Sequence, residues 1–105
     1  MMVAGIPKTV TQGQVAVGVA SVNGVSRNVR RHKVTIQAHP SNTGIIYGHL
    51  CDPATLDEAA TVANAAFALA AGQAWTEDGS AGVAFSGQIT LISDVAAQAA
   101  HVNEY

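Results

Sequence analysis

The sequence predicts an all-β protein, a small β-sandwich or a jelly-roll-like barrel. Three observations support this prediction. Apolar and polar residues alternate with a period of two in several short segments, and turn-forming residues separate these segments about every ten residues. Valine, isoleucine, leucine and alanine must fill the core, because aromatic residues make up only 5% of the chain. The 105 residues suit one domain, which we place at 15–105 behind an N-terminal arm at 1–14.

The N-terminal region contains the arm and the first predicted strand. Residues 1–14 are rich in Gly, Pro, Thr and Gln, and they fit an arm or an edge strand because Pro7 and Gly13 disfavour a central strand. Residues 15–20 alternate and predict a strand. One face of this strand would present Val15, Val17 and Val19.

The next segments predict a hairpin and two further strands. Asn23-Gly24 is a strong hairpin-turn signal, and 25–30 would continue as an exposed strand. Residues 33–39 alternate clearly, 40–44 form a turn by composition, and 45–47 form a short strand that ends at Gly48. The inward residues of the strand over 33–39 would be Val34, Ile36 and Ala38.

The middle of the chain is compatible with either a helix or a loop. Asp52-Pro53 resembles a helix N-cap, and Thr55-x-x-Glu58 resembles a capping box, so one short helix near 53–63 is an option. The alternative is a loop over 52–66. Residues 67–75 suit an extended segment.

The C-terminal region predicts two strands. Residues 77–80 form a turn by composition, and 86–93 predict a strand with Ile89 and Leu91 on one face. The segment 96–105 fits a strand better than a short helix.

The charge content suggests a protein that meets a partner. Charged residues make up 11% of the chain, against about 25% in ordinary domains, and uncharged surface of this kind usually contacts another molecule. All Lys and Arg lie at or before residue 33, and all acids lie after residue 51. The folded protein would either have one basic and one acidic pole, or its strands from the two halves of the chain would mix and the poles would disappear. The net charge of −2 argues against nucleic acid as a partner.

No catalytic or cofactor pattern is present, so we expect no enzyme, no cofactor and no small-molecule substrate. The chain has no Gly-x-Ser-x-Gly or phosphate-binding glycine loop, and its paired acids are sequence neighbours. His49-x-Cys51 would place two metal ligands on one strand face, but no second ligand pair follows, so we also expect no metal. Cys51 is the single cysteine, which excludes an intrachain disulfide.

The sequence also suggests where the protein is made. It shows no signal peptide and no long apolar stretch, so we expect synthesis in a reducing cytoplasm and no membrane partner.

Three segments resemble small structural proteins of tailed bacteriophages. They are RHKVTIQAHPSNTGIIYGH at 31–49, FALAAGQAWT at 67–76 and GQITLISDVAAQAAHVNEY at 87–105. The resemblance extends over residues 15–105 and is interrupted by an alanine-rich insertion at 52–66.

This resemblance implies a β-sandwich that decorates the outside of a phage head. Such a cement protein would bind the major capsid protein and stabilise the shell, and a homo-oligomer, preferably a trimer, is implied. No catalytic residue is transferred, and Asn42, Thr43 and Gly44 correspond only to a turn. A tail, neck or fibre-base subunit is one alternative, and a carbohydrate-binding sandwich that uses Trp75 is another, although Trp75 better suits a core anchor.

Two segments are the expected capsid contacts, namely the arm and the densest basic run. The basic run would either dock on an acidic surface or form a solvated strand edge that prevents aggregation. A nucleic-acid contact is the weakest alternative. The expected contact residues are Ile6, Pro7, Lys8, Thr9, Val10, Arg27, Arg30, Arg31 and Lys33.

Overall fold

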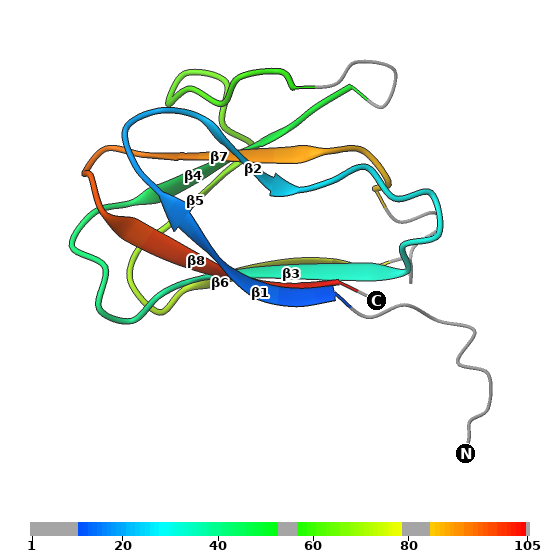
Figure 1. Ribbon diagram of the computed structural model, residues 1–105, viewed down its shortest axis with the longest axis horizontal. Coiled ribbons are helices and arrows are strands. Elements are labelled where there is room, and N and C mark those ends of the chain that lie inside the picture. Colours follow the sequence, from blue (N-terminus) through cyan, green and yellow to red (C-terminus); the bar gives the residue numbers. More distant parts are fainter. Residues whose placement is uncertain (1–10, 53–56, 79–84, 105) are drawn as a thin grey trace.

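The computed structural model is an all-β sandwich of two four-stranded antiparallel sheets (Figure 1). It describes residues 11–52, 57–78 and 85–104. The first sheet has the order β1-β8-β3-β6 and the second has the order β2-β7-β4-β5. The strands are β1 Thr11–Val17, β2 Val22–Val25, β3 Lys33–Ala38, β4 Ile46–Leu50, β5 Phe67–Leu69, β6 Ala74–Asp78, β7 Ile89–Ser93 and β8 Gln98–Glu104.

The two sheets face each other across one apolar core. Alternate residues of β3 and β8 are buried, as the period-two pattern requires, whereas four of the five residues of β7 are buried. The largest fully buried side chains are Ile36, Ile46, Ile89, Leu91, Val17, Val34 and Cys51. The predicted sandwich is therefore confirmed, and among the described residues no helix is long and apolar enough to cross a membrane.

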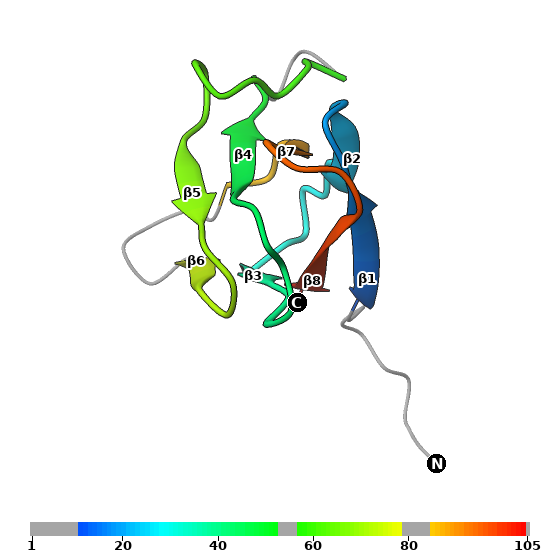
Figure 2. The same ribbon diagram turned by 90° about the vertical axis from the view of Figure 1, so that its left-hand side faces the viewer.

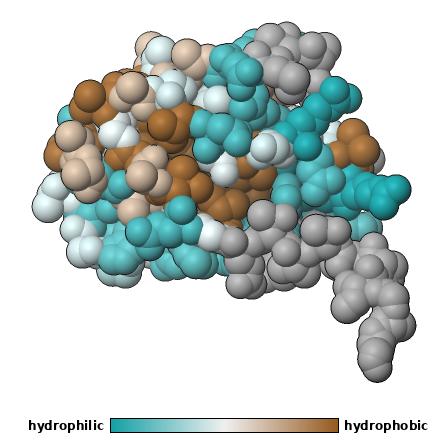
Figure 3. Space-filling model, viewed as in Figure 1, coloured by the Kyte–Doolittle hydropathy of each residue, from teal (hydrophilic) through white to brown (hydrophobic). Residues whose placement is uncertain are grey.

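The two long sides of the sandwich differ. On one side the edge strands β5 and β6 lie together (Figure 2). The ring of Phe67 stacks there on the ring of Trp75, with centroids 4.5 Å apart. On the other side are the edge strands β1 and β2, and Figure 3 shows apolar surface between them. The partly buried Val15 and Val22 pack against the core from these two strands.

The first strand starts earlier and ends sooner than expected. Residues 11–14 belong to β1, an edge strand, rather than to an arm, while 1–10 lie outside the described residues. Edge pairing to β8 accounts for the tolerance of Gly13, because an edge strand needs only one partner. Val19 lies in the turn after β1 and is 64% exposed, so its predicted place on a strand face is wrong.

The predicted hairpin turn at Asn23-Gly24 is wrong. Both residues lie within β2, where the pairing with β7 shifts register between Asn23 and Val25. A Cβ on Gly24 would lie 2.7 Å from the side chain of Leu91, so glycine lets the two strands approach closely at this bulge. The strand expected over 25–30 is also absent beyond Val25.

The optional helix near 53–63 is not formed by residues 57–63, and 53–56 lie outside the described residues. Asp57 has a φ of 62°, which interrupts a right-handed helix. The main-chain N–H of Asp57 donates to Gln88, and that of Ala60 donates to Ser21 Oγ at 2.8 Å. These tertiary hydrogen bonds replace those of a helix, so the loop alternative holds for this stretch.

Most other strand predictions are confirmed. β3 buries Val34, Ile36 and Ala38 as expected, and β7 and β8 occupy the two predicted C-terminal strands. β4 continues through Gly48 instead of ending there, since Gly48 pairs with Phe67 of β5 and with Leu91 of β7. The ring of Phe67 occupies the space that a Cβ at this position would need. Glu77 and Asp78 end β6 rather than forming a turn.

Candidate functional site

Arg31 is a buried cross-brace at one end of the sandwich. Its guanidinium donates to Glu104 Oε2 at 2.8 Å, and its side chain is fully buried. It also donates to three main-chain carbonyls, those of Ser26 at 2.8 Å, Phe85 at 2.6 Å and Gly87 at 3.1 Å. These contacts join the β2–β3 loop to β8 of one sheet and to the segment that enters β7 of the other. Arg31 is thus occupied internally and unsuited to the capsid contact expected of it.

The Arg31–Glu104 pair shows that the basic and acidic parts of the sequence lie together in the fold. A base from the first third of the chain meets an acid from its last strand, and Lys33 is in register with Asp78 across β3 and β6. The strands therefore mix the two halves. Sequence analysis missed Glu104, although it shares the inward face of β8 with Ala100 and Val102. An acid on an apolar face indicates a buried partner.

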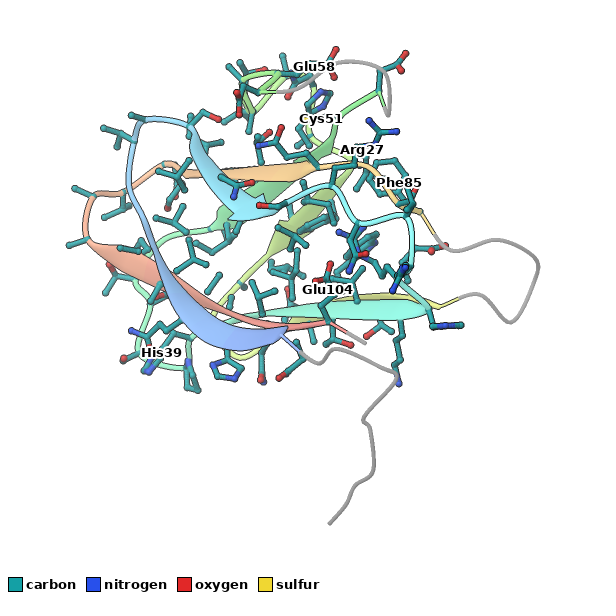
Figure 4. The ribbon with its side chains drawn as sticks, turned by 45° about the vertical axis from the view of Figure 1, so that its right-hand side comes forward. Arg27, His39, Cys51, Glu58, Phe85 and Glu104 are labelled. Carbon is teal, nitrogen blue, oxygen red and sulfur yellow. The ribbon has the colours of Figure 1, made fainter. Side chains whose placement is uncertain are left out.

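The remaining basic residues form an exposed basic end around this brace. Arg27, Arg30 and Lys33 are all exposed in the β2–β3 loop and at the start of β3. Figure 4 shows Arg27 and Phe85 at the end of the sandwich opposite His39.

The chain enters the sandwich at this same end. Thr11, the first residue of β1, is in register with Glu104, the partner of Arg31. The other expected contacts, residues 6–10, lie outside the described residues. They are joined through Thr11 to the end that presents the exposed arginines. The two segments expected to bind a partner are therefore connected to one end of the molecule.

A polar pocket lies beside Arg27. Its volume is about 380 Å³, and its lining residues are Asn23, Ser26, Arg27, Asp57 and Gln88. Gln88 organises the wall, since its side-chain amide donates to Asn23 at 2.9 Å and to Asp57 at 3.0 Å. The pocket thus combines an exposed guanidinium with a carboxylate, which suits a charged or amide side chain of a protein partner better than an apolar one.

A second polar cluster occupies the end of β4. His49 and Cys51 are two residues apart and share one face, as their spacing predicts, and Glu58 reaches them from the following loop. Figure 4 shows Cys51 and Glu58 on this side of the molecule. The His49 ring nitrogen Nε2 is 3.0 Å from Glu58 Oε1, and the main-chain N–H of Asp52 donates to the same oxygen at 2.9 Å. The Asp52 hydrogen bond, followed by that from His49, lowers the pKa of Glu58 below its ordinary 4.5.

Sequence analysis noted His49 and Cys51 but missed Glu58. Glu58 was interpreted as part of a capping box, and that helix is not formed. Cys51 has no exposed surface, and its thiol lies 3.6 Å from the Glu58 carbonyl and 3.9 Å from the Thr90 hydroxyl. A substrate would not reach this thiol as it is packed, so the cluster is unsuited to nucleophilic cysteine chemistry.

Trp75 is packed as the core-anchor interpretation expects. It is half-buried, it packs against the apolar core, and one ring face is covered by Phe67. A sugar-binding platform needs an open aromatic face, which the stack with Phe67 removes on that side.

Comparison with protein-family models, with curated proteins and with solved structures gives no match for this chain.

Proposed function

We propose that this protein is a virion structural protein, a decoration protein that binds the outer surface of a tailed-phage head and stabilises its shell. The observation behind the proposal is that Arg27, Arg30 and Lys33 are exposed at one end of the sandwich. The described part of β1 begins at this same end, where Thr11 is in register with Glu104, the partner of Arg31. One end can then contact the major capsid protein while the rest of the sandwich faces outward.

The edge strand β1 supports the same role. An edge strand presents unpaired main-chain N–H and C=O groups along its outer side, and a partner can add a strand to them. β1 starts at the basic end, so electrostatic contact and strand addition would act on one neighbouring subunit. Many weak contacts of this kind suffice on a repeating lattice, because avidity multiplies them.

The chemistry of the basic end indicates an acidic patch on the capsid. Exposed Lys and Arg attract carboxylates, and salt weakens the attraction because the Debye length is about 8 Å at physiological ionic strength. Binding to shells should therefore fall as salt rises. We place the protein on the exterior of the virion as a homo-oligomer, with a trimer favoured.

The decisive experiment compares particles made with and without the protein by cryo-electron microscopy, with copy number taken from a stained gel. A decoration protein gives added density on the shell and on the order of hundreds of copies, because the shell repeats the binding position many times and avidity keeps the copies bound. A few copies at one vertex would instead indicate a tail, neck or fibre-base subunit. Absence from particles would refute a virion role.

A matched pair of variants tests the contact surface. The double substitution Arg27→Ala/Arg30→Ala removes two exposed charges and should weaken shell binding at least about 10-fold at low salt. His39→Ala/Ser41→Ala changes the opposite end and should bind normally (Figure 4). Equal binding by both double variants would exclude the basic end as the contact. Native mass spectrometry of the free protein tests the trimer.

A further inference from the structure

We propose that His49, Cys51 and Glu58 form a binding site for a divalent metal ion of the zinc class. Their ligand atoms all lie within 4.8 Å of one another. They supply a nitrogen, a sulfur and an oxygen, the donor set that zinc accepts, with a fourth position left for water or a partner's side chain. This site goes beyond the proposed docking role, and it does not depend on it.

The spacing of the ligand atoms is close to that of a tetrahedral site. Zinc bonds of about 2.0–2.3 Å place neighbouring ligand atoms about 3.3–3.6 Å apart. His49 Nε2 and Glu58 Oε1 are 3.0 Å apart, so they need to separate only slightly. The widest ligand separation of 4.8 Å must close by about 1 Å, which side-chain rotation can supply.

The second ring nitrogen of His49 is held as in metal-binding histidines. Nδ1 is 3.2 Å from the main-chain carbonyl of Asn64, and a carbonyl only accepts, so Nδ1 carries a hydrogen. Metal-bound histidines commonly donate their other N–H to such a carbonyl, which orients the ring. Nε2 then points at Glu58 as the coordinating atom.

In this structure the candidate ligand atoms are bonded to protein groups. His49 Nε2 lies 3.0 Å from Glu58 Oε1, and the Cys51 thiol donates to the Glu58 carbonyl at 3.6 Å. Cysteine coordinates a metal as the thiolate, so metal binding would release the thiol proton, and no oxidation or reduction takes place.

The environment of Cys51 favours this exchange. The thiol is buried, and its two contacts at 3.6 and 3.9 Å are long, weak hydrogen bonds. A metal ion would give the sulfur a strong partner without exposing it. Glu58 is already held in position by the Asp52 N–H and by Thr90, whose hydroxyl donates to the Glu58 carbonyl at 2.8 Å.

The alternative is that His49 and Glu58 form only a structural ion pair that fixes the loop to β4. The two hypotheses differ in their response to metal. The full-length protein, reduced and freed of metal with a chelator, is titrated with Co²⁺, whose spectrum reports its ligands. We expect one ion per chain, a thiolate-to-cobalt charge-transfer band, visible bands typical of four-coordination, and reversal of all of these by Zn²⁺.

Three variants make the test specific. Cys51→Ser should abolish the charge-transfer band, and Glu58→Gln, which keeps its shape, should weaken affinity at least about 10-fold. His39→Gln alters a histidine bonded to Ser41 and should bind like the unmodified protein. Zn²⁺ should raise the Tm of the unmodified protein and of His39→Gln, and not that of Glu58→Gln.

The proposal fails if the unmodified protein gives no charge-transfer band, or if Glu58→Gln binds as tightly as His39→Gln. If Cys51→Ser does not fold, the proposal is still tested by the cobalt spectrum of the unmodified protein and by the metal affinity of Glu58→Gln. None of these results bears on binding to phage heads, so the two proposals can fail separately.

Discussion

The pairs Arg31–Glu104 and His49–Glu58 both hold loops among the described residues, and they differ in burial and in the length of chain that they join. Arg31 and Glu104 have side chains that are 0% and 8% exposed, and they join residues 73 positions apart. His49 and Glu58 are 19% and 34% exposed and only 9 positions apart. The first pair links both sheets, whereas the second fixes one loop to the strand that precedes it.

The difference indicates which region serves stability and which can serve binding. The Arg31 guanidinium donates to four oxygens of the described residues, so a ligand could enter only by breaking the brace. His49 and Glu58 are partly open to solvent and adjoin a thiol with weak contacts, so a ligand can reach these side chains without breaking a buried ion pair. Buried, fully satisfied polar groups usually fix a fold, while partly satisfied groups leave capacity for chemistry.

The largest effect should follow from removing the brace itself. Arg31→Met leaves the Glu104 carboxylate buried without its partner and three carbonyls without a donor, so unfolding free energy should fall by about 3–5 kcal/mol. Urea denaturation at neutral pH measures the loss. The matched change Arg30→Met alters an exposed neighbour and should have little effect. Similar losses in both variants would show that Arg31 is not the brace.

A smaller effect should follow from removing only the charge of the acid. Glu104→Gln keeps an oxygen for the Arg31 guanidinium and leaves the three carbonyl contacts intact, so the loss should be about 2 kcal/mol. This loss of unfolding free energy should be nearly the same at low and at high salt, because salt screens a buried pair poorly. A loss that disappears in high salt would mean that the pair is exposed in solution.

The brace also marks how far sequence patterns predict this fold. The strand over 33–38 is predictable because burial of alternate apolar residues is a local property, and the strand over 89–93 is predictable because its Ile and Thr residues have a local preference for extended structure. The position of Arg31 is not, because it depends on an acid 73 residues away. The turn prediction at Asn23-Gly24 is wrong because a glycine can serve either of two purposes. It can permit a tight turn, or, as here, it can let two strands approach closely at a bulge, where Gly24 lies against Leu91.

The loop around Glu58 is unpredictable for a related reason. Local preferences favour a helix there, but the Ala60 N–H bonds to Ser21 and the Asp57 N–H bonds to Gln88. These partners come from distant strands, and they outweigh helix propensity. The candidate metal cluster exists only because of this loop, so sequence analysis found two of its ligands and missed the third.

The loop should loosen when one of these hydrogen bonds is removed. Ser21→Ala leaves the buried N–H of Ala60 without its acceptor at 2.8 Å, which should cost about 1 kcal/mol. Hydrogen exchange at Ala60 should accelerate, while exchange in β3 and β8 should stay unchanged. Ser41→Ala, at an exposed turn, is the control. Equal acceleration in β8 would mean that the loop and the brace open together.

The smallest effect at neutral pH should come from Glu58→Gln in the presence of a chelator, and its sign depends on pH. The folded state lowers the pKa of Glu58 below 4.5, so the ionised form stabilises the fold fully above about pH 4.5 and loses that contribution as pH falls through the lowered value. The unfolding free energies of Glu58→Gln and of the unmodified protein should therefore be similar in acid and should differ above about pH 4.5.

A double-mutant cycle with His49→Gln isolates the part of this difference that is due to the histidine, because the Asp52 N–H hydrogen bond persists in both backgrounds. Curves that stay parallel down to acid pH would show that the Glu58 carboxylate is not held as the structure describes, and would leave the buried brace as the one ion pair of the two that acts on stability.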